Sequence, residues 1–375
     1  MTRALLLSFL AALLLAAHDA RAHKPSDSTL TLELAGTSVT GQWDIALRDL
    51  DHAIGLDGDG DGAITWGELK SRHGEVAAYA LARLRLGPQA APCALSVTDH
   101  LVARHSDGAY AVLVLRAACP RVRDSLEVAY SLLFDLDPQH RGLLQVRAGG
   151  TTQTAVLAPA QPARSFALGQ PDLLRQILDY FREGVWHIWI GTDHILFLIT
   201  LLLPAVVVRG ASAWRPVEGF GAAFLSVAKI VTAFTLAHSV TLALAVLEVV
   251  VLPSRLVESV IAASVAAAAL NNLWPLVTRR LWLMAFAFGL VHGFGFASVL
   301  ADLGLPGETL FWALASFNLG VEAGQLAIVA AVLPLTYWIR RSAFYGRLAL
   351  PLGSAAIALV GGLWLLERAL ELPLG

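Results

Sequence analysis

Four histidines of this sequence lie inside long apolar stretches, where an ionisable side chain is costly. They are His187, His194, His238 and His292. An ionisable group at the centre of a membrane-spanning helix costs about 3 kcal/mol on insertion scales, so each of them needs a reason to be there. His187 and His194 are seven positions apart, so on one helix they project within about 20° of each other. Neutral imidazole binds divalent transition metals well, and this face therefore predicts a metal site.

Carboxylates accompany these histidines. Asp193 directly precedes His194, and a carboxylate can either bind a metal or orient a histidine that does. Asn318, Glu322 and Gln325 follow one another at spacings of four and three, so they share one face of a later helical segment. The alternative is that all these groups only form hydrogen bonds between helices. We predict a shared transition-metal centre formed by His187, Asp193, His194, His238, His292 and Glu322.

The twelve residues from Asp57 to Glu68 match the calcium-binding loop of an EF-hand. Asp57, Asp59 and Asp61 occupy loop positions one, three and five and supply hard oxygen ligands to one centre. Gly62 allows the sharp turn at position six, and Glu68 closes the site with two oxygens. The alternative is a solvated acidic loop that only resembles the pattern. We predict a Ca²⁺ site that braces the domain, formed by Asp57, Asp59, Asp61, Ala63, Thr65 and Glu68.

The beginning of the sequence predicts export. Arg3 supplies a positive start, Leu5–Ala17 is apolar but too short to span a membrane, and residues 20–22 form a small-x-small cleavage site. We therefore expect residues 1–22 to be a signal peptide and the mature chain to begin at His23, outside the membrane.

The only two cysteines, Cys93 and Cys119, both fall in the part of the chain that would be exported. A disulfide can persist in that compartment. Because both cysteines lie beside strand-like runs, we expect a bridge across neighbouring strands. Two free buried cysteines are the alternative.

Residues 23–171 are expected to form a small β-rich extracytoplasmic domain, such as a sandwich, because apolar and polar residues alternate in several segments. These segments are Thr29–Leu34, Val39–Ile45, Tyr110–Leu115 and Leu126–Phe134. The EF-hand-like loop 57–68 would form a helical insert in this domain, with helical segments expected at Ile45–Leu56 and Glu68–Leu86.

The rest of the chain reads as an α-helical polytopic membrane bundle. The whole sequence is 56% hydrophobic and only 15% charged, and nearly all the long uncharged runs lie beyond residue 185. Residues 172–184 are amphipathic and are expected to lie along the interface. Within the transmembrane domain, residues 185–370, we predict six spans at about 185–208, 220–250, 256–277, 281–302, 309–338 and 344–367.

Arginines in alternate loops predict the orientation. They are Arg209 and Arg215, Arg279 and Arg280, and Arg340, Arg341 and Arg347. Positive loops face the cytoplasm, so the N-terminal domain and the C-terminus are expected on the periplasmic side of the inner (plasma) membrane. The formal net charge of −2 indicates no nucleic-acid partner, and no phosphate-binding Gly-x-x-x-x-Gly-Lys-Ser/Thr run is present, which argues against ATP hydrolysis.

With these residues in view, the sequence resembles the HupE/UreJ family of membrane proteins, whose members are implicated in nickel or cobalt permeation. His187, Asp193 and His194 match that family's signature of a histidine, five residues, then Asp-His. The exported domain followed by six helices is similar to the larger branch of the family. The sequence departs from the transport-proven type, which has two His-Gly pairs on a later helix, because only His292-Gly293 is present and Phe296 stands near the second position.

The resemblance implies nickel or cobalt as the transported ion, whereas the residues alone indicate a divalent transition metal, zinc and copper included. The primary hypothesis is therefore a metal permease and not an enzyme, with the lipid bilayer and a metal ion as partners. One alternative is an intramembrane zinc-dependent hydrolase, which Ser239 beside His238 favours and the lack of His-Glu-x-x-His opposes. Another is a non-transporting sensor or accessory protein. A homo-oligomer or an extracytoplasmic protein partner stays open.

Overall fold

The computed structural model describes residues 26–105, 108–120, 122, 124–168, 173–209, 214–296 and 307–370. The predicted signal peptide, 1–22, and the predicted start of the mature chain at His23 lie outside the described residues. The chain folds as two compact units, one β-rich and one helical, which divide near residue 180.

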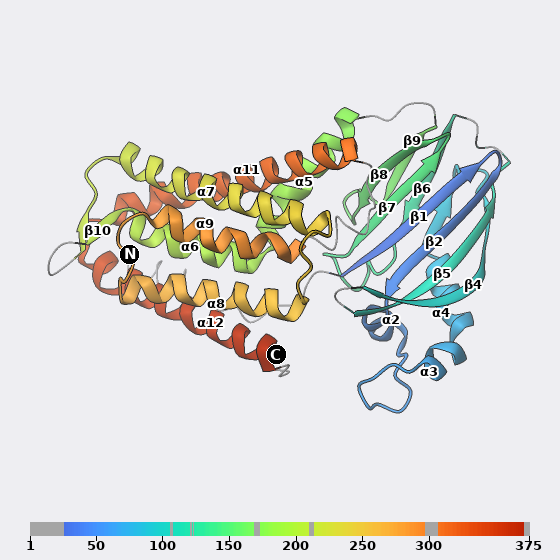
Figure 1. The fold of residues 1–375 in the computed structure, drawn as a ribbon, viewed down its shortest axis with the longest axis horizontal. Helices are drawn as coiled ribbons and strands as arrows, with labels where there is room; N and C mark the ends of the chain where they lie inside the picture. The colour runs from blue at the N-terminus through green and yellow to red at the C-terminus, as the bar shows by residue number, and fades with distance from the viewer. Residues whose placement is uncertain are drawn as a thin grey trace. The chain divides into compact units, whose positions relative to one another are not determined.

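The β-rich unit contains two sheets (Figure 1). The six-stranded sheet has the order β4-β5-β2-β1-β7-β8, and the three-stranded sheet has the order β3-β6-β9. The strands are β1 Asp27–Ala35, β2 Ser38–Ala46, β3 Leu84–Leu86, β4 Ala94–His105, β5 Gly108–Ala118, β6 Ser125–Tyr130, β7 Arg141–Ala148, β8 Thr151–Leu157 and β9 Ala163–Ala167. All neighbours pair antiparallel except β1 and β7, which pair parallel. The predicted β-rich class is confirmed.

Both sheets contribute to one hydrophobic core. Trp43 of β2 and Leu113 of β5 in the large sheet are fully buried with Leu126 and Val128 of β6 in the small sheet. The alternating segments of the sequence became β1, β2, β5 and β6, as predicted. The pattern did not reveal β7. Five successive residues of this inner strand are buried, so its apolar and polar positions do not alternate.

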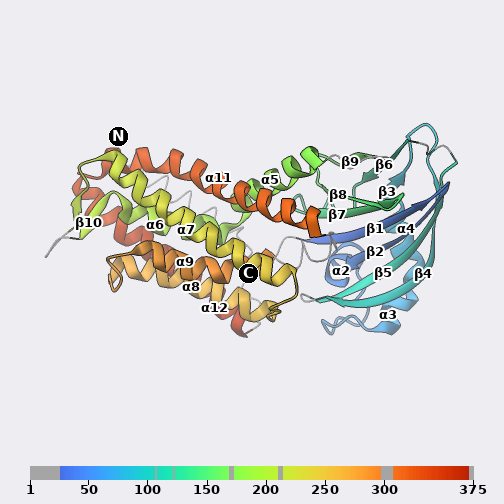
Figure 2. The same cartoon turned by 45° about the horizontal axis from the view of Figure 1, so that its top comes forward.

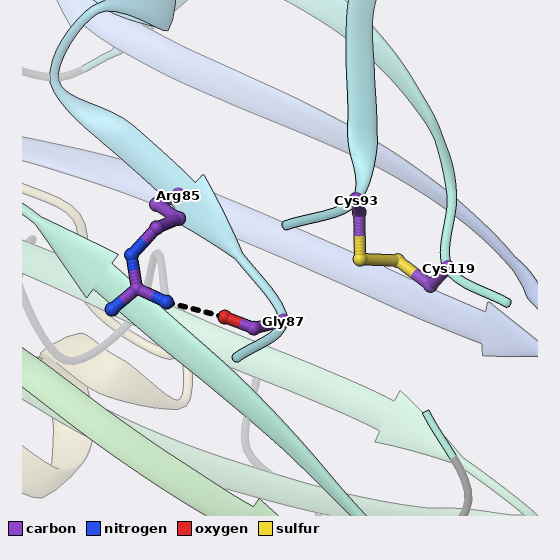
Figure 3. Close-up of a disulfide and its surroundings, with 4 residues drawn as sticks. All are labelled: Arg85, Gly87, Cys93 and Cys119. Carbon is purple, nitrogen blue, oxygen red and sulfur yellow. Dashed lines mark hydrogen bonds between the residues drawn. A yellow bond between two sulfur atoms is a disulfide. The ribbon is translucent and has the colours of Figure 1, made fainter. Parts of the chain in front are cut away.

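A disulfide joins Cys93 and Cys119, as Figure 3 shows, so the predicted bridge is present. Cys93 precedes β4 and Cys119 follows β5, and these two strands pair along their length. The neighbouring turn is fixed by backbone hydrogen bonds, because Cys93 N donates to Leu86 O at 2.8 Å and Gly87 N donates to Glu127 O at 2.7 Å. The Arg85 guanidinium also donates to the Gly87 carbonyl (Figure 3).

Three short helices surround the acidic loop 57–68. They are α2 Leu47–Ile54, α3 Trp66–Ser71 and α4 His73–Leu81. The single helix expected at Glu68–Leu86 is therefore divided at Arg72, and its last part forms β3 instead. Thr65 begins α3 with a capping box, in which its hydroxyl accepts from Glu68 N and the Glu68 carboxylate accepts from Thr65 N.

The helical unit consists of long helices that run side by side (Figures 1 and 2). They are α5 Leu173–Ile190, α6 Thr192–Ala205, α7 Phe220–Val246, α8 Ser254–Leu273, α9 Leu281–His292 with the 3₁₀ turn η2 Gly293–Phe296, α11 Gly307–Ile339, and the π-helical turn η3 Tyr345–Ala349 with α12 Leu350–Leu370. A short hairpin of β10 Val207–Arg209 and β11 Trp214–Pro216 follows α6.

The number of spans differs from the prediction of six. Among the described residues, four helices are long and apolar enough to cross a membrane, and the bent pair α5–α6 makes five if it counts as one span. The fourth predicted span, 281–302, appears as the shorter apolar helix Leu281–Gly295. Residues 297–302 of that prediction lie outside the described residues.

Polarity in this unit is inverted relative to a water-soluble fold. Leu225, Leu236 and Leu359 are 56%, 59% and 65% exposed, whereas His238 and His292 are buried at 0% and 1%. An apolar exterior around a polar interior is stable only in lipid, because exposed leucine surface is unfavourable in water. The unit is therefore a multi-pass membrane bundle.

Candidate metal centre

A break in a membrane helix forms the centre of the candidate site. The sequence predicted an interfacial segment, 172–184, followed by a straight span, 185–208. Instead, α5 continues to Ile190 and α6 begins at Thr192 after a bend of 71°. Gly191 lies at the bend, where an added Cβ would be 2.8 Å from both the His187 carbonyl oxygen and His194 Nδ1. Only glycine fits there without displacing a histidine.

The break brings chemically active side chains to two helix ends. His187 lies in the last turn of α5, while Asp193 and His194 lie in the first turn of α6. The carbonyl end of a helix favours a cation and the amide end favours an anion. Accordingly, the Asp193 carboxylate accepts from His194 N at 2.8 Å.

His238 on α7 has a defined tautomer. Its Nδ1 is 2.9 Å from Asn318 Oδ1 on α11, and Asn318 Nδ2 donates to Leu314 O at 2.8 Å. The amide nitrogen must face the Leu314 carbonyl, so the amide oxygen faces the histidine and Nδ1 carries the proton. The lone pair is then on Nε2, which is buried and has no hydrogen-bond partner.

His292 on α9 also has a defined tautomer. Its Nε2 is 2.9 Å from Ser264 Oγ, and that hydroxyl donates its only proton to Ile261 O at 2.7 Å. Ser264 therefore accepts from His292 Nε2, which leaves the lone pair on the buried, unpartnered Nδ1. Ser264 was not among the predicted site residues, since one serine in an alanine-rich segment carries no visible signal.

His194 completes the set. Its Nδ1 is 3.0 Å from Asp193 Oδ1, and a carboxylate only accepts, so Nδ1 donates and Nε2 holds the lone pair. That Nε2 is also buried without a partner. Histidines that bind metals usually donate their second N–H to a fixed acceptor, as all three do here.

Two groups of side chains can hold a metal ion in the described part of the helical unit. One consists of His187, His194 and His238, and the other of Asp193, His194 and His292. Within each group, the offered ligand atoms lie within 4.8 Å of one another. Five of the six residues predicted as one centre are thus brought together from α5, α6, α7 and α9.

Glu322, the sixth predicted residue, belongs to neither group. Its carboxylate instead accepts from Thr232 Oγ1 of α7 at 2.6 Å. Helical spacing correctly placed Glu322 on one face of α11 with Asn318 and Gln325, whose side chains also reach α7. Of these three polar residues, it is Asn318 that touches a histidine of the site.

Close helix contacts hold the site together. An added Cβ on Gly320 of α11 would lie 2.0 Å from the Phe181 carbonyl oxygen of α5, one to two turns before His187. At Gly293, which follows α9, an added Cβ would lie 2.4 Å from the His238 carbonyl oxygen. The helices that form and orient the site therefore meet backbone to backbone, as small residues permit in membranes.

The acidic loop of the β-rich unit gathers a separate group. Oxygen atoms of Asp57, Asp59 and Asp61 lie within 4.8 Å of one another. Glu68 is not in this group, although it accepts from Gly58 N at 2.7 Å across the loop. Hydrogen bonds from Thr65 and Gly58 lower the pKa of the Glu68 carboxyl to about 2, so it is ionised at neutral pH.

Comparison with known proteins identifies the family. A family model described as HupE / UreJ protein matches residues 164–368. A search of curated proteins finds no match. The matched segment contains the broken helix, all four histidines and Asp193, and it covers more than half of the 375 residues. The chain belongs to the HupE/UreJ family.

Proposed function

We propose that this protein is a permease for a divalent transition metal, with nickel or cobalt as the ion that the family resemblance favours. It would act in the inner (plasma) membrane, with the β-rich unit on the periplasmic side. His187, Asp193, His194, His238 and His292 would bind the ion as it crosses the bundle. The protein would be a transporter and not an enzyme.

One observation carries the proposal. Three buried imidazoles each donate one N–H to an acceptor and keep the other nitrogen's lone pair without a partner. A buried polar atom without a partner is unfavourable by about 1–3 kcal/mol, so several of them close together need a ligand that uses them. A divalent transition metal bound through imidazole nitrogen is such a ligand.

Metal flux into proteoliposomes tests the proposal. Purified full chain would be assayed with Ni²⁺, Co²⁺, Zn²⁺, Cu²⁺ and Mn²⁺ side by side, and compared with a His187→Ala/His194→Ala variant. We expect saturable flux of one or two of these ions and its loss in the variant. His52→Ala, on the exposed surface of α2, is the matched control and should transport normally.

The outcomes separate the alternatives. Tight binding of Zn²⁺ without flux of any ion would contradict the permease and favour a metal-dependent hydrolase or a sensor. The hydrolase has little support, because Ser239 Oγ donates to the Thr235 carbonyl of its own helix at 2.7 Å. That contact is ordinary for a serine in a membrane helix.

We also propose that the loop 57–68 binds Ca²⁺. Asp57 Oδ1 and Oδ2 accept from Gly60 N and Gly62 N, which curls the loop around this carboxylate. Gly62 has φ +84°, the left-handed turn that position six of such a loop requires. Luminescence of Tb³⁺ excited through Trp66, which lies within the loop, would report binding and its displacement by Ca²⁺.

For this loop, Glu68→Gln is expected to weaken Ca²⁺ binding by about 100-fold, because it removes a charged bidentate ligand. Glu75→Gln, on the exposed face of α4, is the matched control and should leave the affinity unchanged. Equal affinities in the two variants would reject Glu68 as a ligand.

A further inference from the structure

The two metal-binding groups of the helical unit overlap at a single residue. His194 belongs to both, whereas His187 and His238 occur only in one and Asp193 and His292 only in the other. The His194 ring lies between the two sets, with centroid distances of 4.7 Å to His187 and 5.1 Å to His292. Apart from His194, the residues of the first set lie on α5 and α7, and those of the second lie on α6 and α9.

A neutral imidazole has one lone pair and can bind one metal ion. His194 is therefore able to complete only one of the two groups at a time. Charge repulsion also disfavours two ions at once, because the repulsion between two divalent ions is four times that between two single charges at the same distance. Asp193 is the only carboxylate in the two groups to offset it.

An aromatic ring packs against imidazoles of both groups. Phe234 of α7 packs against His194, His238 and His292 at centroid distances of 6.1, 6.1 and 5.2 Å. This ring is 1% exposed. Its position among the three imidazoles disfavours one compact site that uses His238 and His292 together, and favours two neighbouring positions.

We infer that the centre holds one ion in two alternative positions, and that His194 remains bound while the ion passes between them. In the first position His187 and His238 are the other ligands, while Asp193 holds the His194 Nδ1–H. In the second position His292 and Asp193 replace them, and the Asp193 carboxylate exchanges its hydrogen bond with His194 Nδ1 for the ion. The ion thereby moves past Phe234 without losing all its ligands. This inference rests on the proposed metal transport, and it states the order in which the ligands of that site bind the ion.

Binding of Co²⁺ to the full chain in nanodiscs, read from its visible absorption, tests the inference together with Co²⁺ flux. Wild type should bind one Co²⁺ per chain. His238→Ala removes a ligand of the first position alone, and His292→Ala removes one of the second alone. Each variant should still bind one Co²⁺, with a spectrum that differs from the other's, and each should lose flux. His194→Ala should lose both binding and flux.

Three results would overturn the inference. The first is binding of two Co²⁺ per wild-type chain. The second is a loss of binding in His238→Ala or His292→Ala that is as complete as in His194→Ala. The third is normal flux in either His238→Ala or His292→Ala. Absence of both binding and flux in wild type for every tested ion would instead reject the proposed function itself. His238→Asn and His292→Asn retain hydrogen-bonding groups toward Asn318 and Ser264, and they replace any alanine variant that does not elute as a single folded species.

Discussion

Buried histidines of two kinds occur in this protein, and their hydrogen bonds distinguish them. His140 in the β-rich unit uses both ring nitrogens, with Ser26 Oγ at 2.7 Å from Nδ1 and the Tyr130 hydroxyl at 2.6 Å from Nε2. His194, His238 and His292 in the helical unit each use one. A fully bonded histidine stabilises the fold around it, whereas a half-bonded one is available to a ligand.

Two groups of the β-rich unit, the buried His140 and the half-buried Asp49, respond to pH in opposite directions. Burial lowers the pKa of His140 to about 4 and raises that of Asp49 to about 6. Below pH 6.5 the unfolded chain protonates this histidine and the native state does not, so stability falls. Between pH 6 and pH 4 native Asp49 binds a proton and the unfolded chain does not, so stability rises.

Asp49→Asn should therefore stabilise the β-rich unit at pH 7 by about 3 kcal/mol, an order-of-magnitude figure from about 1.4 kcal/mol per pKa unit. The gain should vanish by pH 4, where Asp49 is protonated in the native state. Proteolysis of the full chain in increasing urea at pH 7 and pH 4 measures it. An equal gain at both pH values would contradict the assigned pKa.

At the scale of the elements, the candidate metal centre depends on a broken helix and on close glycine contacts. The 71° bend at Gly191 separates His187, at the end of α5, from Asp193 and His194, at the start of α6. His194 then belongs to both ligand groups. The contact at Gly320 sets the distance between α5 and α11. Since His187 is on α5 and Asn318 on α11, this contact also positions the ligand relative to the acceptor that orients His238.

Gly320→Ala is predicted to separate α5 from α11, because its Cβ would overlap the Phe181 carbonyl. We expect a loss of about 1–3 kcal/mol in stability, as for other overpacked sites, and weaker Co²⁺ binding because His187 moves. Gly362→Ala on α12, where an added Cβ meets no atom within 4 Å, is the control. Thermal unfolding in detergent and Co²⁺ titration measure the two effects, and equal behaviour of both variants would contradict the role of the contact.

At the scale of the whole molecule, the short helix α9 decides the membrane topology. Arginines lie after α6, after α8 and after α11 in the sequence. Two crossings, α7 and α8, connect the first two of these loops and keep them on one side. The loop after α11 lies on that same side only if both α9 and α11 cross the membrane. The positive-inside rule therefore requires the short helix α9 to complete a span.

Alkaline phosphatase fusions after Arg280 and after Ser342 test this topology. Both are expected to be inactive, because both loops would face the cytoplasm. Fusions at Gly150, in the β-rich unit, and at Val250, between α7 and α8, should be active. Activity after Ser342 combined with inactivity after Arg280 would show that α9 does not cross.

Much of this architecture follows from local patterns in the sequence. Alternation at a period of two revealed β1, β2, β5 and β6, and long apolar runs revealed the membrane helices, because both signals depend on neighbouring residues alone. The spacing of His187, Asp193 and His194 also predicted a metal site, and the structure places His187 and Asp193 each in a group with His194. The bend at Gly191, the shortness of α9 and the inner strand β7 were missed. A single glycine does not reveal a bend, an apolar run does not show where its helix ends, and β7 lacks the alternation of a half-buried strand.

The sequence by itself determined which residue types are available for chemistry and that they lie within the membrane. Only the tertiary structure decided which of them meet, and which nitrogen of each histidine is open. His238 is oriented by Asn318, 80 residues away, and His292 by Ser264, 28 residues away. The direction of a lone pair is set by a hydrogen-bond partner, and a partner on another helix leaves no periodic signal in the sequence. For the same reason Glu322, on the expected face of its helix, contacts Thr232 and lies outside the site.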